Sequence, residues 1–241
     1  MAKQRIDKII ASSPSYSRSD ASRLIRSGAV GVDGAVIKDS GAKVDPEKSV
    51  ITVYGKRFCY KEHIYIMMNK PSGVVSASEG KGETTVVDLV PDEMKRQGLF
   101  PAGRLDKDTT GFVLITDDGD FAHRILSPKK HVHKTYRVTL REDITPSQKA
   151  EIESGMTLGE EKLMPASVRK LDGEDCVYEV ILKQGLYHQI KRMFARFGNE
   201  VVALERTAIG LLPLDRTLKS GECRELTARE IRAAEELKET E

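Results

Sequence analysis

The sequence FPAGRLDKDTTGFVLIT, residues 100–116, joins a polar loop to an apolar run. Glycines bracket the polar part, and the run from Phe112 to Thr116 has the length and composition of a buried strand. Arg104 and Asp106 therefore lie in a loop directly before a core strand, which is a rigid support from which loop side chains can be aimed. An ordinary polar turn explains the same composition equally well.

The composition is that of a soluble protein with a modest core, since 39% of the 241 residues are hydrophobic and 32% are charged. The apolar runs are far shorter than the ~18 residues of a membrane span. The start, MAKQR, lacks the apolar stretch of a signal peptide. Three cysteines lie far apart, without the paired spacing of a zinc or redox site. These features predict a cytoplasmic protein with no membrane partner.

The small net charge of +2 is unevenly distributed. Residues 1–62 hold 12 Lys and Arg against 7 Asp and Glu, whereas the remainder holds 27 against 30. A positive N-terminal quarter is expected if that part of the chain meets phosphate groups.

This basic quarter is predicted to be a separate small domain, residues 1–60. Arg18, Arg23 and Arg26 belong to its second helix or to the start of that helix, and Arg23 and Arg26 share a face because they are three residues apart. The predicted elements are a helix over 5–11, a helix from an N-cap at Ser19 to Gly28, two strands within 30–36 joined by the turn Asp33-Gly34, and a strand over 50–54.

The N-terminal sequence resembles the S4 RNA-binding domain. The resemblance rests on RID at residues 5–7, on the pattern SRSxAxxLI at residues 17–25 and on VDG at residues 32–34. It implies that the three arginines contact RNA, because a folded RNA is recognised mainly by its shape and its phosphate groups. A solvated charged surface is the alternative explanation of the same residues.

The remainder, residues 61–241, is predicted to form a larger second domain. Alternation and helical spacing predict strands over 64–70, 112–116, 134–140, 175–183 and 201–204, and helices over 121–126, 145–154 and 227–238. They also predict a helix that ends at Gly198 and buries Ile190, Met193, Phe194 and Phe197.

Two clusters in this domain contain metal-ligand residue types. The acidic run at residues 117–120 lacks the ligand spacing of a calcium loop. The pair His131-x-His133 lacks an apparent third ligand. We therefore predict no metal site, and we expect the basic cluster from Lys129 to Lys134 to meet RNA backbone instead.

Four motifs, in this order along the chain, resemble those of the ribosomal-RNA pseudouridine synthases, which detach the base of a uridine, rotate it and rejoin it through carbon. The motifs are NKPSG at 69–73, GRLDKDTTG at 103–111, KTY at 134–136 and HQIK at 188–191. The resemblance implies an α+β fold, with an S4-like RNA-binding domain followed by a catalytic domain. That catalytic domain has a mixed, largely antiparallel sheet flanked by helices, with the site in its central cleft.

The resemblance also implies roles for individual residues. Asp106 is the catalytic residue, and Tyr136 stacks on the target base and helps to move a proton. A basic residue pairs with Asp106; by position this is Lys191, with Arg192 as the alternative. A nearby cation suits a nucleophilic carboxylate because it favours the charged form. A tyrosine suits a flipped base because its ring can stack and its hydroxyl can exchange a proton.

Further substrate contacts follow from the same resemblance. Arg104 is expected to fill the gap left by the flipped uridine, and Leu204 to line the pocket. Lys70, Lys134 and Arg192 are candidate RNA contacts, although a lysine in a turn is more often only solvated. No cofactor is expected, because the reaction is an isomerisation without redox change.

The sequence GRLDKDTTG, followed by TDDG at residues 116–119, most resembles the sequences of the branch of the family that modifies 16S rRNA, at uridine 516. We expect a monomer whose partner is 16S rRNA, either naked or within an assembly intermediate of the small subunit. Two alternatives stay open: a synthase acting on 23S rRNA, and a non-catalytic rRNA-binding or ribosome-assembly protein.

Overall fold

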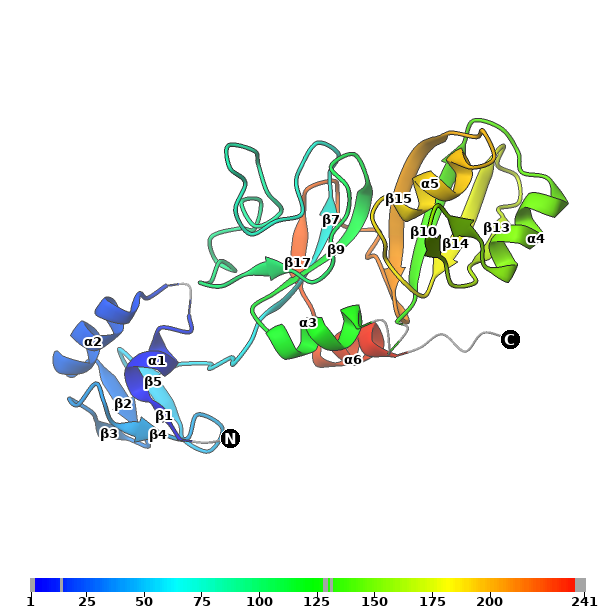
Figure 1. Ribbon diagram of the computed structural model, residues 1–241. Coiled ribbons are helices and arrows are strands. Elements are labelled where there is room, and N and C mark those ends of the chain that lie inside the picture. The colour runs from blue at the N-terminus through cyan, green and yellow to red at the C-terminus, as the bar shows by residue number, and fades with distance from the viewer. Residues whose placement is uncertain (1–2, 14, 128–129, 131, 237–241) are drawn as a thin grey trace. The chain divides into compact units, whose positions relative to one another are not determined.

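The computed structural model describes residues 3–13, 15–127, 130 and 132–236. The chain divides into two compact units (Figure 1). The N-terminal unit comprises Met1–Ile64 with Val90–Gly98, and the larger unit comprises Tyr65–Leu89 with Leu99–Glu241. The predicted boundary after residue 60 lies shortly before this division. The sequence did not predict that residues 90–98 belong with the N-terminal unit, where Arg96 donates to the carbonyls of Lys61 and Glu62.

The N-terminal unit joins two helices and a four-stranded sheet around one apolar core. The sheet has the order β3-β2-β5-β6, and β1 pairs separately with β4. Isoleucines of the first helix and Leu24 and Ile25 of the second pack on Ile51 and Val53 of the sheet. The elements are α1 (Ile6–Ile10), α2 (Arg18–Arg26), β1 (Gln4–Arg5), β2 (Val30–Val32), β3 (Ala35–Val36), β4 (Lys43–Val44), β5 (Ile51–Val53) and β6 (Lys56–Arg57).

Local chemistry explains the helix and hairpin of this unit. Ser17, and not the predicted Ser19, caps α2: its hydroxyl accepts from the Asp20 amide at 3.1 Å, while the Asp20 carboxylate accepts from the Ser17 amide at 3.2 Å. Such a reciprocal pair satisfies two amides that the helix itself leaves free. Asp33 and Gly34 both have positive φ, 51° and 86°, which the tight turn between β2 and β3 requires.

The larger unit is built on one mixed sheet with the order β13-β14-β10-β15-β9-β7-β17. Neighbours along this order are antiparallel except β15 and β9, which run parallel. The predicted α+β class with a largely antiparallel sheet is therefore confirmed. The strands are β7 (Tyr65–Lys70), β8 (Phe100–Pro101), β9 (Thr110–Thr116), β10 (Lys134–Leu140), β11 (Thr157–Leu158), β12 (Glu161–Lys162), β13 (Ser167–Lys170), β14 (Val177–Leu182), β15 (Val201–Ile209), β16 (Leu212–Pro213) and β17 (Cys223–Glu225).

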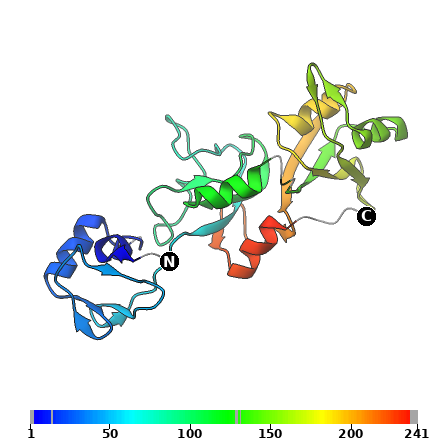
Figure 2. The same ribbon diagram turned by 60° about the horizontal axis from the view of Figure 1, so that its bottom comes forward.

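Helices cover both halves of this sheet (Figures 1 and 2). Helices α3 (Gly119–Leu126) and α6 (Ala228–Glu235) lie side by side, and their apolar residues share a core with β7 and β9. Helix α4 (Pro146–Ser154) packs against β13, and α5 (Gln189–Ala195) packs against β15. None of these helices, in the part of the chain that is described, is long and apolar enough to cross a bilayer.

The acidic run at residues 117–120 serves helix α3. Asp118 is the N-cap, and its carboxylate accepts from the Phe121 amide at 2.9 Å and from the Tyr65 hydroxyl at 2.6 Å. The acidic run thus caps a helix and anchors a neighbouring strand.

The parallel contact between β9 and β15 depends on a glycine. Only two residue pairs are in register there, Glu205 with Thr110 and Arg206 with Gly111. Gly111 has φ +93°, and a Cβ at this position would lie 2.4 Å from the Arg206 carbonyl oxygen. The two halves of the sheet can approach because residue 111 has no side chain.

Candidate active site

Lys70, the last residue of β7, fixes the loop before β9 through hydrogen bonds to backbone carbonyls. Its ammonium group donates to the carbonyls of Pro71, Lys107 and Thr109 at 3.0, 3.0 and 2.8 Å. The side chain is fully buried, and burial lowers its pKa to about 8, although the charges of Asp108 and Asp106 oppose the shift. The prediction that Lys70 contacts RNA is therefore wrong, because its three donors are used inside the protein.

Backbone contacts fix the same loop further. The Leu105 amide donates to the Ser76 hydroxyl at 3.1 Å, and the Leu105 side chain is buried. The Thr109 amide donates to the Asp106 carbonyl at 3.1 Å. The Asp106 side chain thus projects from a loop whose backbone is tied to two other segments, as a precisely aimed carboxylate requires.

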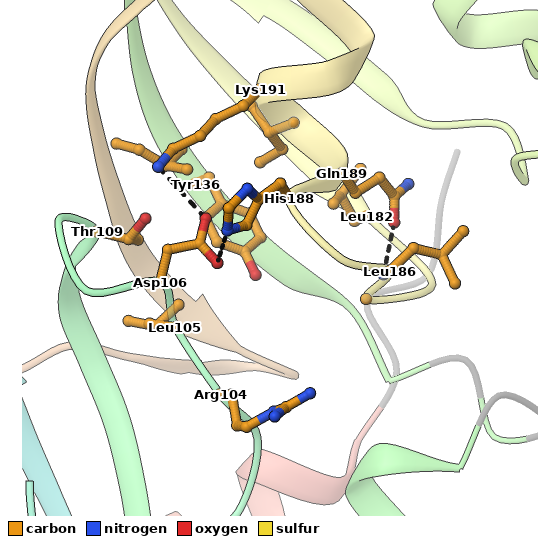
Figure 3. A pocket seen from close by; sticks show the side chains of 13 residues that line it. Arg104, Leu105, Asp106, Thr109, Tyr136, Leu182, Leu186, His188, Gln189 and Lys191 are labelled. Atoms are coloured by element: carbon orange, nitrogen blue, oxygen red, sulfur yellow. Dashed lines mark hydrogen bonds and ion pairs between the residues drawn. The ribbon is translucent and has the colours of Figure 1, made fainter. Parts of the chain in front are cut away.

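This loop forms one wall of a pocket of about 450 Å³ that is open to solvent (Figure 3). Strands β10, β14 and β15 and the start of α5 supply the other walls. The lining residues are Arg104, Leu105, Asp106, Thr109, Tyr136, Leu182, Gly185, Leu186, His188, Gln189, Ile190, Lys191 and Leu204.

Two side chains converge on the Asp106 carboxylate (Figure 3). The Lys191 Nζ lies 3.4 Å from Asp106 Oδ2, and the His188 Nε2 lies 3.4 Å from Asp106 Oδ1. The Asp106 side chain is 26% exposed, so that it faces the pocket while remaining open to a substrate. Arg192, the other basic candidate, instead pairs with Glu161 at 2.6 Å. Of the two cations that the sequence offered, Lys191 is the one beside Asp106.

Lys191 also contacts a second carboxylate, that of Asp108. Its Nζ donates to Asp108 Oδ1 at 2.6 Å and to Oδ2 at 2.8 Å. The hydrogen bond from Lys191 lowers the pKa of Asp108, against a smaller effect of burial. Burial lowers the pKa of Lys191, but its hydrogen bond to Asp108 and the charges of both aspartates outweigh this and raise it. Lys191 therefore stays charged at neutral pH.

Sequence reasoning assigned no role to Asp108 or His188. Both stand within the quoted motifs, Asp108 two residues after Asp106 and His188 three residues before Lys191. Their place within these motifs is the sequence feature that could have identified them as site residues. His188 is the N-cap of α5 and has a left-handed backbone with φ 47°.

Three further pocket residues that the sequence singled out come from three separate segments. Tyr136 on β10 is nine-tenths buried with its ring in the pocket wall, and Leu204 on β15 lines the pocket as predicted. Arg104 is exposed, and Figure 3 shows its guanidinium directed away from the Asp106 carboxylate.

In the basic cluster before β10, Lys130 is exposed and stays a candidate RNA contact, whereas His133 and Lys134 are buried. Lys134 is buried, and its Nζ donates to the carbonyls of Ile125 and Val132 at 3.1 and 2.7 Å. Burial, and to a smaller extent the charge of Arg206, lowers the pKa of Lys134 to about 8. Its prediction as an RNA contact is wrong because the side chain turns inward. Lys129 and His131 lie outside the described residues.

The arginines of the N-terminal unit lie at its surface. The side chains of Arg18 and Arg23 are 65% and 77% exposed, and Arg26 is exposed as well. Arg23 pairs with Asp20 in the same helix. An exposed ion pair of this kind is weak and leaves the guanidinium able to exchange partners.

Among the residues that the structure describes, the cysteines and the metal-ligand residue types form no second site. Cys59, Cys176 and Cys223 are not joined in disulfides. Within residues 3–13, 15–127, 130 and 132–236, no three or more His, Cys, Asp or Glu side chains are grouped so as to hold a metal ion.

Two family models match the chain. Residues 64–196 match the RNA pseudouridylate synthase family, and residues 4–50 match the S4 domain. The first match contains all of the pocket residues named above except Leu204.

Relatives similar over nearly the whole chain carry related names. An uncharacterized RNA pseudouridine synthase of Bacillus subtilis (strain 168) is 46% identical over 94% of this chain and 96% of its own length. The ribosomal small subunit pseudouridine synthase A of Vibrio cholerae is 41% identical over 94% and 97%. That of Salmonella typhimurium is 42% identical over 94% and 98%. A crystal structure of a pseudouridylate synthase matches at a TM-score of 0.66 and 38% identity, over 96% of this chain and 99% of the other.

Proposed function

The chain belongs to the RNA pseudouridylate synthase family, and from this premise we propose that it isomerises one uridine of 16S rRNA to pseudouridine, with Asp106 as the catalytic carboxylate. The observation that carries the proposal is the convergence of Lys191 and His188 on Asp106, at 3.4 Å each, in a pocket walled by Tyr136. The choice of 16S rRNA rests on relatives named ribosomal small subunit pseudouridine synthase A. The predicted position is uridine 516.

Binding begins with the RNA backbone. The exposed arginines of α2 meet phosphate groups, and the target uridine leaves its stack to enter the pocket beside Asp106. Arg104, in the same loop as Asp106, occupies the place that the uridine leaves. Its guanidinium is planar and can stack on the neighbouring bases while it donates hydrogen bonds.

Asp106 acts as an ionised carboxylate, for which Lys191 supplies the countercharge. It acts either as a nucleophile on the base or by assisting cleavage at C1′. In both routes the C1′–N1 bond breaks, a C1′–C5 bond forms, C5 loses its proton and N1 gains one. Nothing is oxidised or reduced, so the overall reaction needs no redox cofactor.

Tyr136 is suited to hold the base while it turns. Its ring lies in the pocket wall and offers an apolar face to a flipped base. Its hydroxyl can carry the proton that leaves C5. Leu204, on the adjacent strand β15, narrows the pocket from a second side.

The test is to incubate the purified protein, without added cofactor, with unmodified 16S and 23S transcripts and with partly assembled small-subunit particles. Pseudouridine is then mapped at nucleotide resolution. One new pseudouridine in 16S rRNA that is absent with Asp106→Asn supports the proposal. A site in 23S rRNA keeps the chemistry and rejects the target. Tight binding without any modification rejects the enzymatic role and favours the ribosome-assembly alternative.

A further inference from the structure

An exposed aromatic ring stands beside the candidate active site and is not used by the reaction proposed above. The Tyr187 ring stacks on the His188 imidazole, with ring centroids 3.8 Å apart and 16° between the planes. One face of the Tyr187 ring is thus covered, yet the residue is 73% exposed. The other face is therefore open to solvent.

The backbone sets this arrangement. His188 has φ 47°, a left-handed conformation that a residue with a side chain adopts only at some cost. The conformation lets the His188 imidazole reach the Asp106 carboxylate while its neighbour Tyr187 remains at the surface. The turn that places one ring in the pocket therefore also places the other ring outside it.

Tyr187 lines a second, larger groove that continues from the pocket. This groove has about 1210 Å³ of open space, and residues 75–78 and the β8 strand line its far side. Tyr187 lines the groove but not the pocket itself. The groove and the pocket share Arg104, Leu105, Asp106, Gly185, Leu186 and His188. A polymer with one unit in the pocket can therefore place an adjoining unit in the groove.

We propose that Tyr187 is a stacking platform for the base of a nucleotide that adjoins the target uridine; the identity of the ligand rests on the proposed function. When one nucleotide flips out of a strand, its neighbours lose a stacking partner and expose a ring face. While Arg104 fills the vacated place, a flat aromatic side chain with one open face can stack on an adjoining base that Arg104 leaves uncovered, whichever base it is. The imidazole behind Tyr187 restricts the tilt of the ring, so the platform is already oriented before RNA binds.

A fluorescence experiment tests the contact directly. The chain has no tryptophan, so Tyr187→Trp introduces a single indole. The variant is combined with Asp106→Asn and titrated with a fragment of 16S rRNA that contains uridine 516, the predicted target. A stacked base is expected to quench the indole. The control is Leu211→Trp, at an exposed position that lines neither the pocket nor the groove, where no quenching is expected. Equal quenching at both positions, or none at 187, overturns the proposal.

A binding cycle assigns the partner base. Tyr187→Ala is expected to weaken binding of the RNA fragment about 5-fold or more, whereas Tyr187→Phe keeps the ring and binds as the wild type does. An abasic residue on one side of the uridine is expected to weaken binding to the wild type by a similar factor. It should have no further effect on Tyr187→Ala, because both changes remove the same contact. The proposal is overturned if the loss of affinity caused by Tyr187→Ala adds to that caused by an abasic residue, whichever side of the uridine the abasic residue occupies.

The kinetics separate this platform from a structural role. Loss of a flanking stack raises KM and leaves kcat near its wild-type value, because the contact is the same in the ground and transition states. A fall in kcat with unchanged KM would assign Tyr187 to the support of His188 and overturn the platform. If the indole of Tyr187→Trp is quenched by the RNA but the protein with Asp106 intact forms no pseudouridine, the stacking role of Tyr187 stands and only the proposed reaction is rejected.

Discussion

Lys191 is bound more closely to Asp108 than to Asp106. Its Nζ lies 2.6 Å from Asp108 Oδ1 but 3.4 Å from Asp106 Oδ2. The Asp108 side chain is 69% exposed, whereas that of Asp106 is 26% exposed. The cation at the site is therefore positioned by an outer carboxylate and shared with the inner one, which leaves the inner carboxylate free to act on a substrate.

Asp108→Asn is expected to lower kcat about 5- to 10-fold. In the wild type the Asp108 charge orients Lys191 and raises the pKa of Lys191, and the substitution removes this charge. The measurement is kcat for pseudouridine formation in the wild-type and in the Lys191→Gln background. In the second background Asp108→Asn should have little further effect, because the lysine through which it acts is gone. An equal loss in both backgrounds would show that Asp108 acts on the RNA itself.

Lys191→Gln is expected to lower kcat about 100-fold, which corresponds to ~2.7 kcal/mol of transition-state stabilisation. The substitution leaves Asp106 without its countercharge once RNA has excluded water. Lys191→Arg keeps the charge and should recover part of the rate. Arg192→Gln is the matched comparison on the same helix, and it should lower kcat much less because Arg192 pairs with Glu161. A larger loss for Arg192→Gln than for Lys191→Gln would exchange their roles.

Asp106→Asn is expected to reduce pseudouridine formation by at least about 1000-fold, because a neutral amide can neither attack as a carboxylate nucleophile nor supply negative charge to assist cleavage at C1′. The melting temperature and the Kd for RNA should stay close to the wild-type values. The reason is that the Asp106 side chain is partly exposed and its partners are side chains at the pocket surface. Turnover near the wild-type rate would remove Asp106 from the mechanism.

The free energy of unfolding should rise as the pH increases from about 8 towards 10, in part through Lys70. Burial lowers its pKa in the folded protein to about 8, from the ordinary 10.5. Between these values the unfolded chain binds a proton that the folded chain does not, so folding becomes more favourable with rising pH. The contribution of one such group is at most ~1.4 kcal/mol per pH unit. Urea unfolding at several pH values measures the slope.

Lys134, whose pKa is likewise lowered to about 8, adds to the same slope. The control is Lys70→Met, which should reduce the slope between pH 8 and 10 without abolishing it. An unchanged slope in Lys70→Met would show that Lys70 does not titrate in this range.

Gly111→Ala is expected to destabilise the protein by roughly 2–4 kcal/mol. The new Cβ would lie 2.4 Å from the Arg206 carbonyl oxygen, and the residue has φ +93°. Gly119→Ala is the matched control, because a Cβ there meets nothing within 4 Å and the residue begins helix α3. It should be neutral or slightly stabilising. Similar melting temperatures for the two variants would contradict the close approach of β9 and β15.

Sequence by itself determined the features that depend on neighbours along the chain. The apolar run after Gly111 became the buried strand β9, the Asp33-Gly34 turn joined two strands, and Thr227 with Glu230 capped α6. These follow from side-chain periodicity and from local hydrogen bonding, which act over a few residues. The ordered motifs likewise identified the family and the α+β class.

Tertiary structure decided which charged groups meet. Lys70 and Thr109 are 39 positions apart, and Lys191 and Asp108 are 83 apart, yet each pair is hydrogen-bonded. The sequence around a lysine does not reveal whether its side chain is buried or which acceptors its ammonium group contacts. Lys70 and Lys134 were therefore predicted as RNA contacts although both turn inward. Likewise, only contacts between segments show that Lys191 lies beside Asp106, whereas Arg192 pairs with Glu161. The physical reason is that burial and ion pairing are set by contacts between distant segments, which local patterns do not contain.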